Sequence, residues 1–158
     1  MTDESLRAGI LAASPSELGT MRQAGLILEK LGVGHEIRIM SSSRNPDLVD
    51  EYARTAFERG LKVVICSTGM SGHLAAAVAA RTILPVIGVP IATLPQMLGP
   101  EALAITAQMP TGVPVATVGV DASVNAAVLA AQIVGIGDAE VQAALWRFKD
   151  DLAEGLKL

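Results

Sequence analysis

Apolar residues along this chain follow two kinds of spacing that alternate with one another. Short runs that are apolar throughout, or apolar at every second residue, predict β-strands. Apolar residues three and four positions apart predict helices with one buried face. The predicted strands span residues 6–12, 35–40, 61–66, 85–91 and 113–120. The predicted helices span residues 20–31, 46–59, 73–81, 101–107, 123–134 and about 138–156.

The alternation of strand and helix predicts the class of the fold. Strands joined by helices run parallel, and the helices cover both faces of the sheet. We therefore expect an α/β domain with three layers and a doubly wound parallel sheet. The helix at about 138–156 comes after this repeat, as an extra C-terminal element. A chain of 158 residues has the size of one domain, so residues 1–158 are assigned to a single domain.

Three loops that follow predicted strands carry most of the polar side chains with binding chemistry. In doubly wound sheets, ligands bind at the carboxyl ends of the strands, so these loops are expected to line one site. The candidate residues are Ser14, Ser16 and Glu17 in the first loop, Ser41, Ser43 and Arg44 in the second, and Ser67, Gly69, Met70, Ser71 and His73 in the third.

The second loop has a pattern typical of an anion site. Its serines and Arg44 precede Pro46, which is suited to the first position of a helix. Free backbone N–H groups and the helix dipole favour an anion there, and a guanidinium can grip phosphate or carboxylate with two hydrogen bonds. Alternatively, Ser43 or Asn45 could cap the helix, and Ser14 or Ser16 could cap the helix before it.

Composition narrows the function further. A net charge of −4, scattered basic residues and an aromatic content of 3% argue against nucleic-acid binding. No apolar run reaches the roughly 18 residues of a membrane span, and the polar, acidic start of the chain does not resemble a secretory signal. Two histidines and one cysteine give no recognisable set of metal ligands.

The single cysteine and the high apolar content carry two further expectations. Because Cys66 is the single cysteine of the sequence, an internal disulfide is ruled out, which fits a reducing compartment. We therefore expect a cytoplasmic protein. Apolar residues make up 51% of the chain and its mean hydropathy is +0.46. For a chain of this length, that predicts burial of surface in a homo-oligomer.

The order of several motifs resembles the 5-(carboxyamino)imidazole ribonucleotide mutase and aminoimidazole ribonucleotide carboxylase family of purine biosynthesis. The resemblance runs over about residues 8–133. Its motifs are Ser14-x-Ser16 followed by an acid, Ser41-x-x-Arg44-x-Pro46, a small-residue loop running into His73-Leu74, Leu84-Pro85-Val86-Ile87-Gly88-Val89-Pro90, Gln108-Met109-Pro110, Gly112-x-Pro114-Val115-Ala116-Thr117 and Asn125-Ala126-Ala127.

The resemblance implies a flavodoxin-like subunit in a homo-octamer, without a metal or an organic cofactor. It implies a ribonucleotide substrate whose carboxylate moves from an exocyclic nitrogen to a ring carbon, through release and recapture of carbon dioxide. By position, Ser14, Ser16, Ser41 and Arg44 would hold the 5′-phosphate, and Glu17 the ribose hydroxyls. The third loop, with Ser67, Gly69, Met70 and Ser71, would face the base.

The chain departs from the family pattern where the proton is transferred. The family has a histidine at the position of Ser43, and a hydroxyl cannot take up that proton near neutral pH. His73 is the substitute acid–base candidate. Two alternatives therefore stand beside the mutase: a paralogue acting on a different ribonucleotide in a specialised pathway, and a ribonucleotide-binding paralogue without catalysis.

Overall fold

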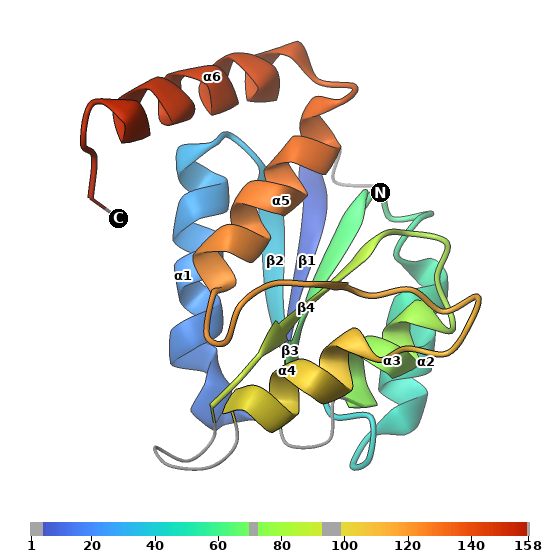
Figure 1. Cartoon of the computed structure of the whole chain (residues 1–158). Coiled ribbons are helices and arrows are strands. Elements are labelled where there is room, and N and C mark those ends of the chain that lie inside the picture. The colour runs from blue at the N-terminus through green and yellow to red at the C-terminus, as the bar shows by residue number, and fades with distance from the viewer. Residues whose placement is uncertain (1–4, 70–72, 93–98, 158) are drawn as a thin grey trace.

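Five parallel strands form one sheet at the centre of the protein (Figure 1). The computed structural model describes residues 5–69, 73–92 and 99–157. The order β2-β1-β3-β4-β5 reverses the direction of winding between β1 and β3, which is the switch point of a flavodoxin-like fold. The strands are β1 (Leu6–Ala12), β2 (Gly34–Ile39), β3 (Val63–Thr68), β4 (Val86–Pro90) and β5 (Ala116–Thr117).

Helices cover both faces of this sheet, as the alternating pattern predicted. In Figure 1, α1 and α5 lie on one face, α2 and α3 lie on the other, and α6 packs across the end of α5. The helices are α1 (Leu18–Lys30), α2 (Pro46–Thr55), α3 (His73–Ala79), α4 (Gly99–Ala107), α5 (Ser123–Gly135) and α6 (Ala139–Ala153), and a 3-10 turn, η1 (Pro15–Glu17), precedes α1.

The sheet separates two apolar clusters. Ile10 and Ile65 point to the cluster under α1 and α5, whereas Leu11 and Val64 point to the cluster under α2 and α3. Side chains of successive strand residues alternate between the two faces, and both faces are covered, so β1 from Ala8 to Ala12 and β3 from Val63 to Cys66 contain no polar side chain. The site at the end of these strands therefore rests on a rigid, fully buried base.

The last strand is much shorter than predicted. Only Ala116 and Thr117 pair with β4, although the apolar pattern suggested a strand over 113–120. Pro114 has no N–H to donate to a sheet, and Gly112 turns the chain with a φ of +88°. Helix α2 also ends early, at Thr55, because the chain turns through residues 56–60 to reach β3.

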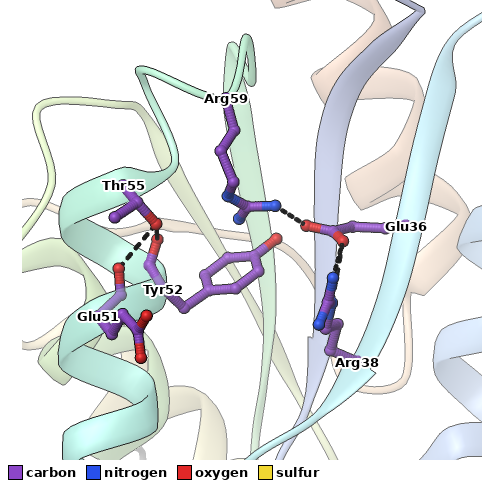
Figure 2. Close-up of polar contacts among 6 residues, drawn as sticks. All are labelled: Glu36, Arg38, Glu51, Tyr52, Thr55 and Arg59. Atoms are coloured by element: carbon purple, nitrogen blue, oxygen red, sulfur yellow. Dashed lines mark hydrogen bonds and ion pairs between the residues drawn. The ribbon is translucent and has the colours of Figure 1, made fainter. Parts of the chain in front are cut away.

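An ion-pair network ties the edge strand β2 to the chain that follows α2 (Figure 2). Glu36 Oε1 accepts a hydrogen bond of 2.6 Å from Arg59 Nη1, and Glu36 Oε2 accepts one of 2.9 Å from Arg38 Nε. Burial raises the pKa of Glu36, but the bonds from Arg59 and Arg38 outweigh it and leave the pKa below its usual value. The Tyr52 ring lies 4.5 Å from the Arg59 guanidinium.

Candidate functional site

A cleft of about 260 Å³ opens at the carboxyl ends of β1, β2 and β3. The three loops predicted to meet there do so, beside the switch point of the sheet. Of the predicted residues that the structure describes, all except Ser16 line the cleft. Ser16 lies next to it, with its Oγ 2.7 Å from Ser14 Oγ. Met70 and Ser71, from the third loop, lie outside the described residues.

The second loop is folded on itself around Ser41. The Ser41 N–H donates to Asn45 Oδ1 at 2.6 Å, and Ser41 Oγ accepts from the Arg44 N–H at 3.3 Å. Asn45 precedes Pro46 at the start of α2, but its side chain turns back to Ser41 and does not cap the helix. Ser43 Oγ lies 3.2 Å from Ser41 Oγ. Neither capping alternative is seen here, and the N-terminus of α2 remains suited to an anion.

Arg44 connects the second loop to the first. Its Nη2 donates a hydrogen bond of 2.8 Å to the carbonyl oxygen of Ala13. The other N–H groups of the guanidinium make no hydrogen bond within the described part of the chain. A planar guanidinium anchored at one corner keeps its remaining donors in a fixed direction, which suits recognition of a phosphate or a carboxylate.

Glu17 and Ser67 form a buried pair below these loops. Glu17 is 5% exposed and Ser67 is fully buried. Ser67 Oγ donates to Glu17 Oε2 at 2.5 Å, and the Ala13 N–H lies 2.9 Å from Ser67 Oγ and 3.1 Å from Glu17 Oε2. Both the N–H and the carbonyl of Ala13 are thus occupied, and groups from all three loops meet at this one residue.

His73 is the first residue of α3, and its exposed ring lines the cleft. Within residues 5–69, 73–92 and 99–157 the ring makes no hydrogen bond or ion pair. An imidazole without a protein partner is available to a ligand. The second histidine, His35, lies on β2, with Nδ1 3.4 Å from the carbonyl oxygen of Val33.

Some features of the cleft were not found from the sequence. Ala13 and Leu74 also line it, and neither has a side chain that signals a site, whereas Ser42 lines it as one of the serines of the second loop. The contact between Ser67 and Glu17 joins residues 50 positions apart, so no local pattern reveals it. Across the described ranges, no three His, Cys, Asp or Glu side chains gather as metal ligands would.

A larger hollow, of about 550 Å³, lies beside the cleft between α2 and α3. Three of its four charged lining side chains bind one another, because Asp50 accepts from Arg54 Nε at 2.7 Å and from Arg81 Nε at 3.0 Å. The cleft at the strand ends differs because its guanidinium, imidazole and hydroxyls face a common space. We therefore take the cleft as the candidate site.

Comparison with known proteins identifies relatives over almost the whole chain. Residues 7–155 match the family model described as AIR carboxylase. The chain is 42% identical to the N5-carboxyaminoimidazole ribonucleotide mutase of Pyrococcus abyssi over 146 residues, which cover 92% of this chain and 83% of that protein. It is 45% identical to the mutase of the same name from Thermotoga maritima over 144 residues, covering 91% and 84%.

A longer relative and a crystal structure add to this picture. The chain is 44% identical to the phosphoribosylaminoimidazole carboxylase of Schizosaccharomyces pombe over 153 residues, which are 96% of this chain and 27% of that protein. The crystal structure of Treponema denticola PurE superposes with a TM-score of 0.83 at 25% identity, over 93% of this chain and 91% of that one. The flavodoxin-like sheet and its flanking helices are common to both structures.

Proposed function

Because this chain belongs to the AIR carboxylase family, we propose that it catalyses the N5-carboxyaminoimidazole ribonucleotide mutase reaction of purine biosynthesis. The observation that carries the proposal is the identity of 42–45% to two proteins of that name, over more than 90% of the chain. The chemistry is of the isomerase or carboxy-lyase type. The cleft at the switch point has the groups that this substrate requires.

The reaction makes three demands on the site. The bond between the exocyclic nitrogen and the carboxyl carbon breaks, carbon dioxide is released, and it is captured by a ring carbon. That carbon loses a proton and the nitrogen gains one, so atoms and charge balance. The site must hold the 5′-phosphate, keep carbon dioxide from escaping and move one proton.

Arg44, Ser41 and Ser14 form the phosphate site in this proposal. Apart from the bond to Ala13, the Arg44 guanidinium has no hydrogen-bond partner within the described residues, and Ser41 precedes the N-terminus of α2. Ser14, with Ser16 bonded to it, is in the neighbouring loop. Cationic, hydroxyl and helix N-terminal donors from two loops would then surround the phosphate, and no carboxylate of the second loop competes for Arg44.

His73 is the proton-transfer group in this proposal. Imidazole is the ordinary side chain that exchanges protons near neutral pH, and the ring of His73 is free within the described part of the chain. Ser43 lines the same cleft and can donate or accept a hydrogen bond, but its hydroxyl is too weakly acidic to serve as the acid–base group. Gly69 of the third loop lines the cleft and would face the base.

Turnover of N5-carboxyaminoimidazole ribonucleotide by the purified protein tests the proposal. We expect formation of the ring-carboxylated isomer, with kcat about 100-fold lower in His73→Asn and a nearly unchanged KM. Ser43→His provides a second acid–base group and should restore activity in the His73→Asn background. Full kcat in His73→Asn would remove the role of His73 without affecting the mutase assignment.

Ser43 also favours one alternative function. A hydroxyl where the family has its histidine suits an enzyme that acts on a different ribonucleotide. In the same assay, absence of turnover by both the wild type and Ser43→His, together with tight binding of aminoimidazole ribonucleotide, would favour that reading or a non-catalytic paralogue. Failure to bind either of these two ribonucleotides would overturn the mutase assignment.

The proposed assembly is a homo-octamer in the cytoplasm. Among the described residues, three large apolar side chains are strongly exposed in the single chain: Ile83 at 81%, Ile136 at 82% and Trp146 at 72%. Ile136 and Trp146 border one apolar groove of about 310 Å³ between α5 and α6. Such a surface supports burial between subunits. Cys66, a buried free thiol, supports a reducing compartment, and no described helix is long and apolar enough to cross a membrane.

A further inference from the structure

The hydroxyl of Ser67 makes two hydrogen bonds of opposite kinds. The Ala13 N–H is a donor, so Ser67 Oγ accepts from it. A serine hydroxyl carries one hydrogen, and that hydrogen points to Glu17 Oε2. Ser67 is fully buried at the end of β3 and cannot exchange these partners for water. The orientation of its hydroxyl is therefore fixed by the fold.

The carboxylate of Glu17 is anchored through one of its two oxygens. The bonds from Ser67 and from the Ala13 N–H both end on Oε2, and no hydrogen bond within the described residues ends on Oε1. Glu17 also lines the cleft. A carboxylate oxygen only accepts hydrogen bonds, so Oε1 suits a ligand group that donates one.

Charge decides which part of a ligand this oxygen can meet. A phosphate would be repelled by Glu17 and attracted by Arg44 and the N-terminus of α2. Sugar hydroxyls, in contrast, are neutral donors. The ligand's anionic end therefore belongs at Arg44, and its hydroxyl-bearing part belongs at Glu17.

We propose that Ser67 is a positioning residue that fixes Glu17 so that Oε1 accepts a hydrogen bond from a ribose hydroxyl of the substrate. This inference rests on the proposed function for the identity of the substrate. A glutamate side chain has three rotatable bonds, and ordering it on binding would cost affinity. Ser67 orders it in advance, with the N–H of Ala13 as the second anchor.

Ser67→Ala removes the anchor of Glu17 and leaves the Glu17 side chain itself unchanged, and Thr68→Val is the matched control. Thr68 is the next residue of β3; its buried hydroxyl lies 2.6 Å from Thr106 Oγ1, away from the cleft. We expect KM to rise roughly tenfold in Ser67→Ala with kcat within about twofold. Thr68→Val should change the free energy of unfolding but leave KM unchanged.

A sugar comparison separates positioning from a general structural role. By calorimetry, the wild type should bind aminoimidazole ribonucleotide more tightly than its 2′-deoxy or 3′-deoxy counterpart. The larger of these two ratios should fall about tenfold in Ser67→Ala and in Glu17→Gln. Ser67→Ala should add nothing in the Glu17→Gln background, because both changes remove the same interaction. Ser67→Cys retains the size of the side chain with a weak donor, and should behave as Ser67→Ala if folding is unaffected.

Each remaining outcome contradicts a different statement. If Ser67→Ala changes neither KM nor the ratio of the affinities for the ribose and deoxyribose forms, the positioning role of Ser67 is overturned and the mutase assignment is intact. Equal binding of the ribose and both deoxyribose forms by the wild type would overturn the role of Glu17 Oε1, and with it that of Ser67. A wild type that binds neither aminoimidazole ribonucleotide nor its two deoxy counterparts would overturn the proposed function itself.

Discussion

Arg44 serves two purposes with one side chain, since it holds the first loop through Ala13 and offers its other donors to the cleft. Arg44→Ala should raise KM for N5-carboxyaminoimidazole ribonucleotide roughly 30- to 100-fold, because charge-assisted hydrogen bonds to phosphate are lost. Arg44→Lys should recover only part of this, since an ammonium group cannot form two parallel bonds. Steady-state kinetics measures both. Arg22→Ala, on the exposed surface of α1, is the control and should leave KM unchanged.

Gly9, in the middle of β1, provides space for a buried aromatic ring. A Cβ at this position would lie 2.1 Å from Tyr52 Oη and 2.8 Å from Leu61 Cδ2. Gly9→Ala should therefore lower the free energy of unfolding by about 1–3 kcal/mol, measured by urea denaturation. Gly19→Ala adds a methyl group that would meet no described atom within 4 Å beyond its own stretch of helix, and it should not destabilise the protein.

A second variant shows whether this clash is the cause. The Tyr52 hydroxyl is buried without a hydrogen-bond partner among the described residues, so Tyr52→Phe should cost little stability on its own. In the Gly9→Ala background, Tyr52→Phe should recover much of the lost stability because it removes the clashing oxygen. Additive effects of the two changes would contradict this account.

At the scale of elements, the Glu36 network predicts how the stability depends on pH. The pKa of Glu36 is lowered from 4.5 in the folded protein, so its ionised form stabilises the fold above that pH. The contribution is lost as the pH falls through the lower, folded-state pKa. Glu36→Gln should reduce the free energy of unfolding by about 1–2 kcal/mol at pH 7.

Urea denaturation at several pH values tests this dependence. The difference between the wild type and Glu36→Gln should shrink below pH 4.5, because protonated Glu36 no longer forms the ion pairs with Arg38 and Arg59. Glu58→Gln, exposed and without an ion pair among the described residues, should show no such difference. A constant difference between pH 3 and pH 7 would contradict the electrostatic origin.

The order and type of these elements could be predicted because local residues determine them. Pro46 begins α2, Asp138 caps α6 with bonds to two backbone N–H groups, and β3 is apolar on both faces. The length of the last strand could not be predicted in the same way. Its apolar residues suit a strand, but Pro114 and the sheet edge limit pairing to Ala116 and Thr117.

The sequence predicts which loops form the site, but it does not predict the hydrogen bonds between their side chains. The type of fold brings the ends of β1, β2 and β3 together, so Ser14, Ser41, Arg44 and His73 could be placed in one cleft from sequence. The anchoring of Glu17 by Ser67 depends on the depth and direction of two side chains from distant segments. Such a contact becomes visible only when the fold is known.

At the scale of the whole molecule, the exposed groove between α5 and α6 predicts assembly. Light scattering should give a mass of about eight times the 16.3 kDa of one chain. Trp146→Glu should lower that mass, because it places a charge on the groove that Ile136 also borders. Leu26→Glu, an exposed apolar position on α1, is the comparison and should affect the mass less if the groove is the contact. A monomeric wild type would contradict the proposed assembly.

Ala13 joins the loops through its backbone alone. Its N–H and its carbonyl oxygen both bond to neighbouring loops, whereas its side chain is only a methyl group. Alanine scanning passes over it, and replacement by Gly or Ser keeps the same backbone groups. Chemical synthesis of the chain with an ester in place of the Ala13 amide would remove the donor and spare every side chain. Side-chain mutagenesis therefore cannot test the contribution of Ala13, whereas replacement of its backbone amide can.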